Sequence, residues 1–364
     1  MSPGPIHVLH VESGHEWRQT RNQVGLLVDG LRSYPGIRQA VATLERSRLA
    51  VAARSLDVPV IPLPWAVGTD PRALRTLALH TRRHWDVVHA HDTHALRLLT
   101  YLLALDGSRS GLVAARRTVA PPRSAWKWRR ANLVIAVSES ARQALVAAGV
   151  ERSRIRVVPE GLDTKGLEPQ QPGLLRAAAG AEEDHFLIGS LAALGPDRDH
   201  MTLLRAALLV VQRHPQVRFA VFGDGPQRGM LEHQIEVLGL GGKVCLPGFV
   251  PEARAGLVDL DLVIMPSIRE ELSTGCLESL WMGVPVVMTA EGDGRLRREG
   301  IEPVRQGDHA AMAEAIGRFV VDEGYRRQMS EQAKGLAGAH DAGLVVAQTV
   351  EAYDTVARQC RRGG

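Results

Sequence analysis

Cysteine is scarce in this chain of 364 residues. Its three cysteines, Cys245, Cys276 and Cys360, are too few for a disulfide framework and form no CxxC or other metal-binding spacing. Such usage is typical of a reducing compartment. Long apolar runs are also absent, because the longest, 203–211, contains Arg205 and falls far short of the roughly 20 residues that span a membrane. We therefore expect a soluble protein.

Targeting segments, low-complexity tracts and short-period repeats are not visible either. The first five residues are polar and lead directly into a strand-like run. With 45% hydrophobic and 23% charged residues, the composition is close to that of average soluble domains, which excludes disordered and fibrous proteins. At about 150 residues per domain, the length predicts two domains. We expect a cytoplasmic protein.

The formal net charge of +4 hides an asymmetry between the halves. Residues 1–164 contain 23 Lys and Arg against 13 Asp and Glu, whereas the rest contains 21 against 27. This difference in charge indicates two domains that bind different partners. A basic half suits nucleic acid, a phosphorylated substrate or an anionic membrane. Nucleic acid is disfavoured, because no helix-turn-helix or RNA-binding motif accompanies the charge.

Strand and helix signals alternate along both halves of the chain. Strands are expected at 6–11, 40–44, 59–62, 86–91, 112–115, 133–137, 156–159, 186–189, 218–222, 243–246, 262–265 and 285–288. Helices are expected at 21–31, 71–85, 139–148, 201–214, 226–238, 275–282, 309–321, 325–337 and 342–358. The alternation predicts an α/β protein with two doubly wound parallel sheets facing a central cleft, and ligands at the carboxyl ends of the strands.

The most informative segment is 266–287, in which two glutamates are eight residues apart. Glu270 lies in an expected loop after a strand, and Glu278 lies inside the next expected helix. The polar loop between them leads into the N-terminus of the helix, where free N–H groups can bind a phosphate. One carboxylate can then accept hydrogen bonds from sugar hydroxyls and the other from ribose hydroxyls. The segment resembles the E-x7-E signature of the retaining GT-B glycosyltransferases of family 4, also called group 1.

Further motifs extend this resemblance along nearly the whole chain. They are a VPNGVD-like linker at 157–163, a GDGP turn at 223–226, a GFV motif at 248–250, the strand before the signature at 261–267, amino-terminal motifs at 86–91 and 136–139, and a WRGGQ-like loop at 16–23. Each motif is weak alone, but their order and spacing together are specific.

The resemblance implies a GT-B fold of two Rossmann-like domains. Residues 1–164 would form the acceptor-side domain, 165–341 the donor domain, and 342–364 a helix that packs back towards the amino-terminal domain. The implied activity is transfer of a sugar, with retention of configuration, from a UDP-, GDP- or dTDP-sugar to a glycan, lipid-linked or small-molecule acceptor. The family needs no metal or other cofactor, since protein cations and a helix N-terminus balance the departing diphosphate.

The resemblance also implies roles for individual residues. Glu270 and Arg198 are the expected catalytic residues. The residues expected on the donor are Glu278, Gly275, Thr274, Ser273, Gly223 and Arg198. The residues expected on the acceptor side are His91, Arg117, Arg18 and Thr20.

Some positions depart from the family pattern. Ala193 stands where an arginine on the diphosphate is expected, and Gln19-Thr20 replaces a glycine pair. A histidine is missing within 115–117, and the segment 290–295 diverges from the usual GGxPEVV. These departures leave two alternatives open: a non-catalytic protein that binds a nucleotide sugar, and a GT-B epimerase or phosphorylase.

Two short patterns resemble metal sites: a pair of aspartates and a group of histidines. Asp259 and Asp261 have the spacing of metal-dependent transferases, but Asp261 precedes a buried strand, which favours a turn cap. His89 and His91 lie on one side of an expected strand, followed by Asp92 and His94. This order differs from that of zinc hydrolases and favours acceptor contact or a structural role over metal.

A basic segment at 116–130 holds six Lys and Arg residues interleaved with Trp126 and Trp128. A solvated arginine-rich surface, peripheral anchoring to an anionic membrane and binding of an anionic acceptor all remain open.

Overall fold

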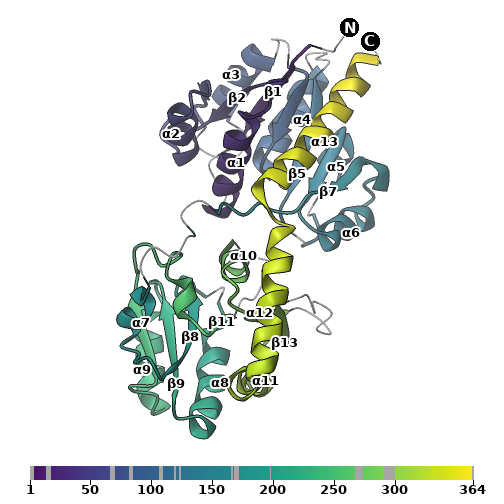
Figure 1. Cartoon of the computed structure of the whole chain (residues 1–364). Helices are drawn as coiled ribbons and strands as arrows, with labels where there is room; N and C mark the ends of the chain where they lie inside the picture. Colours follow the sequence, from purple (N-terminus) through teal and green to yellow (C-terminus); the bar gives the residue numbers. More distant parts are fainter. Residues whose placement is uncertain are drawn as a thin grey trace. The chain divides into compact units, whose positions relative to one another are not determined.

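The computed structural model describes residues 4–13, 18–65, 70–81, 85–105, 110–118, 120–122, 124–164, 167, 172–196, 198–266, 274–290 and 300–362, without the side chains of 18–22, 290 and 362. The chain divides into two compact units (Figure 1). Unit 1 comprises Met1–Asp163 and Asp341–Gly364, and unit 2 comprises Thr164–His340.

Unit 1 contains a parallel sheet of seven strands in the order β3-β2-β1-β4-β5-β6-β7. Its strands are β1 (Ile6–Val11), β2 (Ile37–Thr43), β3 (Val60–Pro62), β4 (Val87–Ala90), β5 (Gly111–Arg116), β6 (Leu133–Ala136) and β7 (Ile155–Val157). Its helices are α1 (Arg18–Leu31), α2 (Arg48–Ser55), α3 (Pro71–Thr81), α4 (Thr93–Leu105), α5 (Trp126–Arg130), α6 (Glu139–Ala147), the 3-10 helix η1 (Arg152–Arg154) and α13 (Ala342–Arg362).

The final helix belongs to unit 1, although it comes last in the sequence. In Figure 1 the yellow α13 runs beside the purple α1 and near β5. Two glycines permit this approach: a Cβ at Gly30 would lie 2.5 Å from Val346, and one at Gly111 would lie 2.1 Å from Val356. Tyr353 of α13 is fully buried. Larger residues at the two glycines would therefore push α13 away from the unit.

Unit 2 contains a parallel sheet of six strands in the order β10-β9-β8-β11-β12-β13. Its strands are β8 (Phe186–Leu191), β9 (Val217–Phe222), β10 (Val244–Gly248), β11 (Leu262–Met265), β12 (Val286–Ala290) and β13 (Ile301–Arg305). Its helices are α7 (Leu174–Ala179), α8 (His200–Arg213), α9 (Arg228–Val237), the 3-10 helix η2 (Leu257–Asp259), α10 (Thr274–Trp281), α11 (His309–Val321) and α12 (Glu323–Gly338).

Both sheets place their first strand between the second and the fourth, so each has a switch point. In unit 1 β1 lies between β2 and β4, and in unit 2 β8 lies between β9 and β11. The loops that follow the two strands at a switch point diverge to opposite faces of the sheet, and this leaves a crevice at the carboxyl ends. The fold therefore provides one such position in each unit.

The α/β fold with two Rossmann-like domains is confirmed, but the sequence patterns missed some elements. The overlooked helices are α2, α4, α5 and α7, and the overlooked strand is β13. α4 is buried on much of its circumference, so its apolar residues do not follow one face. β13 lies at the sheet edge and contains Pro303, which lowers its strand signal.

Candidate functional site

The switch point of unit 2 brings together the loops after β8 and β11. The backbone N–H of Asp199 donates to Pro266 O at 2.7 Å and joins the two loops. Asp199 also caps α8, since its carboxylate accepts from the N–H of Thr202 at 3.2 Å. Arg198 precedes this cap and is half-buried. The loop therefore holds the backbone next to Arg198 beside the switch point.

Gly223 holds the loop after β9 against the loop after β8. Its φ of +152° is in the range that favours glycine, and a Cβ there would lie 2.1 Å from Ala192 O. Its N–H donates to Gly248 O at 2.8 Å, and the N–H of Leu194 donates to Asp224 O at 3.1 Å. Gly223 thus shapes the backbone that positions the loop after β8.

Among the described residues, helix α10 is the first element after β11. A Cβ at Gly275 would lie 3.4 Å from Met265 Cε, so the first turn packs closely on the end of β11. The hydroxyl of Thr274 is buried and has no hydrogen-bond partner among the residues that the structure describes. An N-terminus of this kind offers unpaired N–H groups and partial positive charge to an anion.

Glu278 lies one turn further along α10 and is 5% exposed. Arg254 Nε lies 2.8 Å from its Oε1, and the arginine side chain is 45% exposed. A carboxylate that is buried and paired in this way can accept hydrogen bonds from hydroxyl groups. The sequence patterns missed Arg254, because it lies 24 residues before its partner on another element.

The expected arginine position is occupied by Ala193, which is exposed. Its carbonyl lies 3.2 Å from His200 Nε2, and His200 is 2% exposed. Glu270 and Ser273, which the resemblance also places on the donor, lie outside the described residues. The described part of the site thus consists of Arg198, the turn at Gly223, the start of α10, and Glu278 with its partner Arg254.

The aspartate pair has structural partners, although Asp261 contacts distant residues rather than capping a turn as the sequence predicted. Asp259 accepts from the N–H groups of Gly173 and Leu175 at 2.7 and 2.8 Å and so holds the start of α7. Asp261 accepts from the N–H of Leu187 at 2.8 Å and pairs with Arg176 at 3.2 Å. These contacts account for both carboxylates.

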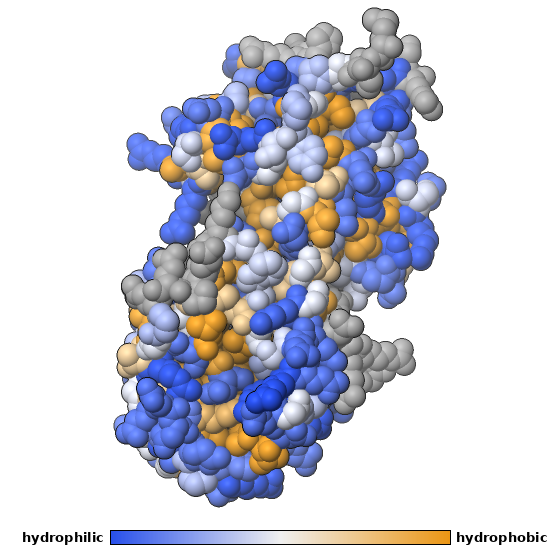
Figure 2. Space-filling model, viewed as in Figure 1, coloured by the Kyte–Doolittle hydropathy of each residue, from blue (hydrophilic) through white to orange (hydrophobic). Residues whose placement is uncertain are grey.

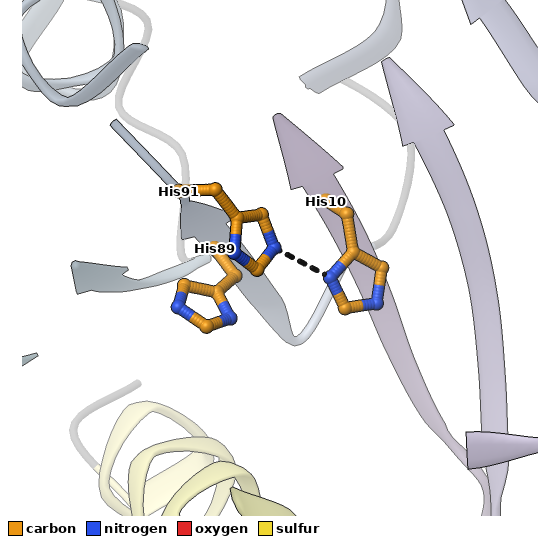
Figure 3. Close-up of side chains that lie close together, drawn as sticks. All are labelled: His10, His89 and His91. Carbon is orange, nitrogen blue, oxygen red and sulfur yellow. Dashed lines mark hydrogen bonds between the residues drawn. The ribbon is translucent and has the colours of Figure 1, made fainter. Parts of the chain in front are cut away.

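The switch point of unit 1 contains three buried histidines. Strand register pairs His10 of β1 with His89 of β4, and His91 follows two residues later (Figure 3). His10 Nδ1 lies 2.9 Å from His91 Nε2, and His89 Nδ1 lies 2.6 Å from the hydroxyl of Tyr353. His91 is 1% exposed and faces His10.

Burial keeps these histidines neutral. It lowers the pKa of His10 to about 4 and the pKa values of His89 and His91 well below the ordinary value. The charge of Arg117 lowers the pKa values of His89 and His91 further. Burial also raises the pKa of the Tyr353 hydroxyl well above its usual range. All four side chains are therefore uncharged at neutral pH.

The carboxylate of Asp92 holds the backbone segments next to the histidines. Asp92 Oδ2 accepts from the N–H of Ser13 at 2.6 Å, and its Oδ1 accepts from the N–H groups of His94 and Ala95 at 2.8 Å. The ends of β1 and β4 are thereby joined, and α4 gains an N-terminal cap. Asp92 therefore has a structural role, and its place after the histidines does not require a site like that of zinc hydrolases.

Arg117 lies at the edge of a small pocket. It forms an ion pair with Glu160 at 3.3 Å, and its side chain is 17% exposed. The pocket has a volume of about 40 Å³ and is also lined by Gln23, His89 and Thr349. That volume is sufficient for water. Helix α1 begins at Arg18 and includes Thr20, but both side chains lie outside the described part of the structure.

The basic segment is partly structural. Arg116 is buried, its guanidinium lies 5.2 Å from the centre of the Trp128 ring, and it donates to Ala120 O. Arg129 donates to Ala148 O at 2.9 Å. Trp126 is 37% exposed. The segment therefore combines internal packing with an aromatic surface position.

Two family models match the chain over most of its length. Glycosyltransferase Family 4 matches residues 21–165, and Glycosyl transferases group 1 matches residues 174–336. The chain belongs to the group 1 GT-B glycosyltransferases. The family recognised from the E-x7-E segment and its accompanying motifs is thus confirmed.

Individual relatives agree with this family. The chain is 33% identical to 2-deoxystreptamine N-acetyl-D-glucosaminyltransferase from Streptomyces fradiae over 41% of its own length and 37% of the relative's. It is 27% identical to D-inositol 3-phosphate glycosyltransferase from Kribbella flavida, over 80% and 77% of the two chains. The chain thus matches little more than a third of the first relative's length.

A solved structure has the same fold. HepE from Anabaena, crystallised with UDP, is 20% identical and superposes with a TM-score of 0.81 over 96% of this chain and 100% of that one. This similarity establishes the shared architecture of the two proteins.

No helix within the described residues has the length and apolar character needed to cross a membrane. On the face that Figure 2 shows, hydrophobic and hydrophilic residues are interspersed on both units.

Proposed function

We propose that this protein is a retaining glycosyltransferase that transfers a sugar from a nucleoside diphosphate donor. The observation that carries the proposal is Glu278, a buried carboxylate on the helix that begins at the switch point of unit 2. Its carboxylate pairs with Arg254, and carboxylate oxygens also accept hydrogen bonds from hydroxyl groups such as those of ribose. Membership of the group 1 family supports the same assignment.

In the proposed reaction the residues of unit 2 bind the donor. Arg198 and the N-terminus of α10 balance the diphosphate charge, Glu278 accepts from the ribose, and Glu270 faces the donor sugar. As the glycosidic bond to the diphosphate breaks, a phosphate oxygen takes the proton of the attacking acceptor hydroxyl. Because protein groups neutralise the leaving group, the reaction requires no divalent metal.

The relatives narrow the substrate class. HepE was crystallised with UDP, which supports a UDP-sugar as the first donor to test, before GDP- and dTDP-sugars. The relatives from Streptomyces and Kribbella are named for 2-deoxystreptamine and inositol phosphate, which are small polyhydroxylated acceptors. We propose an acceptor of that kind or a glycan or lipid-linked acceptor, bound by the basic unit 1.

A panel of sugar nucleotides tests this function. We expect one donor class to raise the melting temperature of the protein, and that donor to release its nucleotide when an acceptor is added, also in EDTA. Mass spectrometry of the glycosylated acceptor, with NMR of its anomeric proton, establishes transfer and retention. Lack of stabilisation by every nucleotide would contradict donor binding, and a strict metal requirement would contradict the cation-based account.

The second candidate is a protein that binds the nucleotide sugar without transferring it. The exposed Ala193, which stands at the position of an expected arginine, favours this alternative. The same panel separates the candidates, since a binding protein gains stability from the donor but leaves it intact with every acceptor.

We also propose that the protein works in the cytoplasm, peripherally at the inner face of the membrane. The three cysteines are free, which suits a reducing compartment. The rings of Tyr101 and Trp126 lie 5.1 Å apart, and Leu105 is 82% exposed. With the basic residues of α5, they form the aromatic and cationic combination that binds anionic lipid surfaces.

Sedimentation with lipid vesicles tests this surface. We expect the protein to bind phosphatidylglycerol vesicles more tightly than phosphatidylcholine vesicles. The substitution Trp126→Ala should weaken binding about fivefold, because a partly buried aromatic contact is lost. Leu79→Ala, at a position on α3 that is 59% exposed, is the matched control and should leave binding unchanged. Equal binding to both lipids would contradict the proposal.

A further inference from the structure

The three histidines of unit 1 are held together by the sheet itself. His10 and His89 are register partners on neighbouring strands, and alternation brings His91 to the same face as His89 (Figure 3). One ring nitrogen of each lies within 4.8 Å of those of the other two. The ring centres of His89 and His91 are 3.9 Å apart. Their convergence therefore follows from rigid backbone pairing.

Hydrogen bonds among the three rings do not explain why all three lie together. A hydrogen bond joins His10 to His91, whereas within the described residues none joins His89 to either of them. All three rings are at most 2% exposed, and imidazole nitrogen is a common metal ligand.

We propose that His10, His89 and His91 bind one divalent first-row transition metal ion, with Zn²⁺ as the first choice. Imidazole nitrogen is a preferred ligand of zinc, and tetrahedral coordination places two such nitrogens about 3.3 Å apart. The 2.9 Å between His10 Nδ1 and His91 Nε2 is close to this value, so a small ring rotation suffices. The hydroxyl of Tyr353 is hydrogen-bonded to His89 and would orient that ring as a ligand.

The charges around the histidines are mixed. The nearby guanidinium of Arg117 opposes a cation, but it is paired with Glu160 at 3.3 Å. Glu12 follows the end of β1 directly, and Asp92 follows the end of β4 after His91; both are buried. Both carboxyl groups therefore lie at the same edge of the sheet as the histidines.

A metal at this position would fasten three separate parts of unit 1. It would join the ends of β1 and β4 and, through Tyr353, the carboxyl-terminal helix α13. We assign it a structural role, separate from sugar transfer. The proposal is therefore independent of the proposed function and is compatible with turnover in EDTA, since a structural ion takes no part in the transfer.

Metal analysis of the untagged full chain tests the proposal. After dialysis against a chelator and reloading with Zn²⁺, gel filtration followed by mass spectrometry of the metal should show one ion per chain. We expect the melting temperature to rise by about 5 °C or more with saturating zinc. Bound zinc well below one ion per chain in the unaltered protein would overturn the proposal without any variant.

Variants then locate the ion. His10→Asn and His91→Asn should each weaken zinc binding at least about tenfold, because a ligand is lost. His233→Asn, at an exposed histidine of α9 in unit 2, is the control and should bind zinc like the unaltered protein. Near-ultraviolet circular dichroism confirms that the variants are folded. Undiminished zinc in both histidine variants, or equal loss in the control, would place the ion elsewhere.

Discussion

Replacing Glu278 with alanine is expected to weaken donor binding by about 100-fold. The buried carboxylate is proposed to accept two hydrogen bonds from ribose, and hydrogen bonds to a charged group contribute about 1.5 kcal/mol or more each. Their loss corresponds to about two orders of magnitude in the dissociation constant. Isothermal titration with the nucleoside diphosphate measures the change, and the KM for the donor should rise in parallel.

Three further variants separate ribose binding from other roles of Glu278. Glu278→Gln keeps the shape of the side chain and should recover part of the affinity. Arg254→Ala removes the ion pair of 2.8 Å but leaves the carboxylate, so it should cost much less than Glu278→Ala. Glu314→Ala, at an exposed position of α11, should have no effect. Equal losses for Arg254→Ala and Glu278→Ala would mean that the glutamate acts through the ion pair rather than on ribose.

Replacing Arg198 with alanine is expected to weaken donor binding by about 30-fold and to lower kcat. Its guanidinium is proposed to contact the diphosphate, and a charge-assisted bidentate contact is worth about 2 kcal/mol. Because charge accumulates on the leaving group as the sugar departs, the effect on kcat/KM should exceed the effect on binding. Steady-state kinetics together with titration of the diphosphate measures both quantities.

The matched variants are Arg198→Lys and Arg205→Ala. Lysine keeps the charge without the planar fork and should lose only a few-fold. Arg205 is exposed on the neighbouring α8 and should tolerate alanine without loss. If lysine and alanine at 198 were equally damaging, the proposed phosphate contact would be wrong.

Much of the fold could be predicted from local patterns. Apolar runs marked buried parallel strands such as β1 and β11, and serine or aspartate before a helix marked caps such as Ser138, which accepts from the N–H of Ala141 at 3.1 Å. The E-x7-E segment identified the family because it combines a strand end, a helix start and two carboxylates at fixed spacing. These features are local, so a single segment is enough to show them.

Other elements could not be predicted because their stability comes from distant residues. The short α7 begins where Asp259, more than eighty residues later, accepts from its backbone N–H groups. The overlooked α4 is apolar on much of its surface because it is buried, which removes the periodicity of a surface helix. Neither feature is visible within a window of neighbouring residues.

For the sites, the sequence by itself determined the chemistry available: a glutamate on the helix after β11, an arginine after β8, and two histidines that alternate along β4. Tertiary structure alone decided which groups meet. It paired Glu278 with Arg254 at 2.8 Å, and strand register placed His10 beside His89 and His91. Side-chain type and local spacing are encoded along the chain, whereas contacts between separate strands and helices depend on how the sheet orders them, which one sequence does not specify locally.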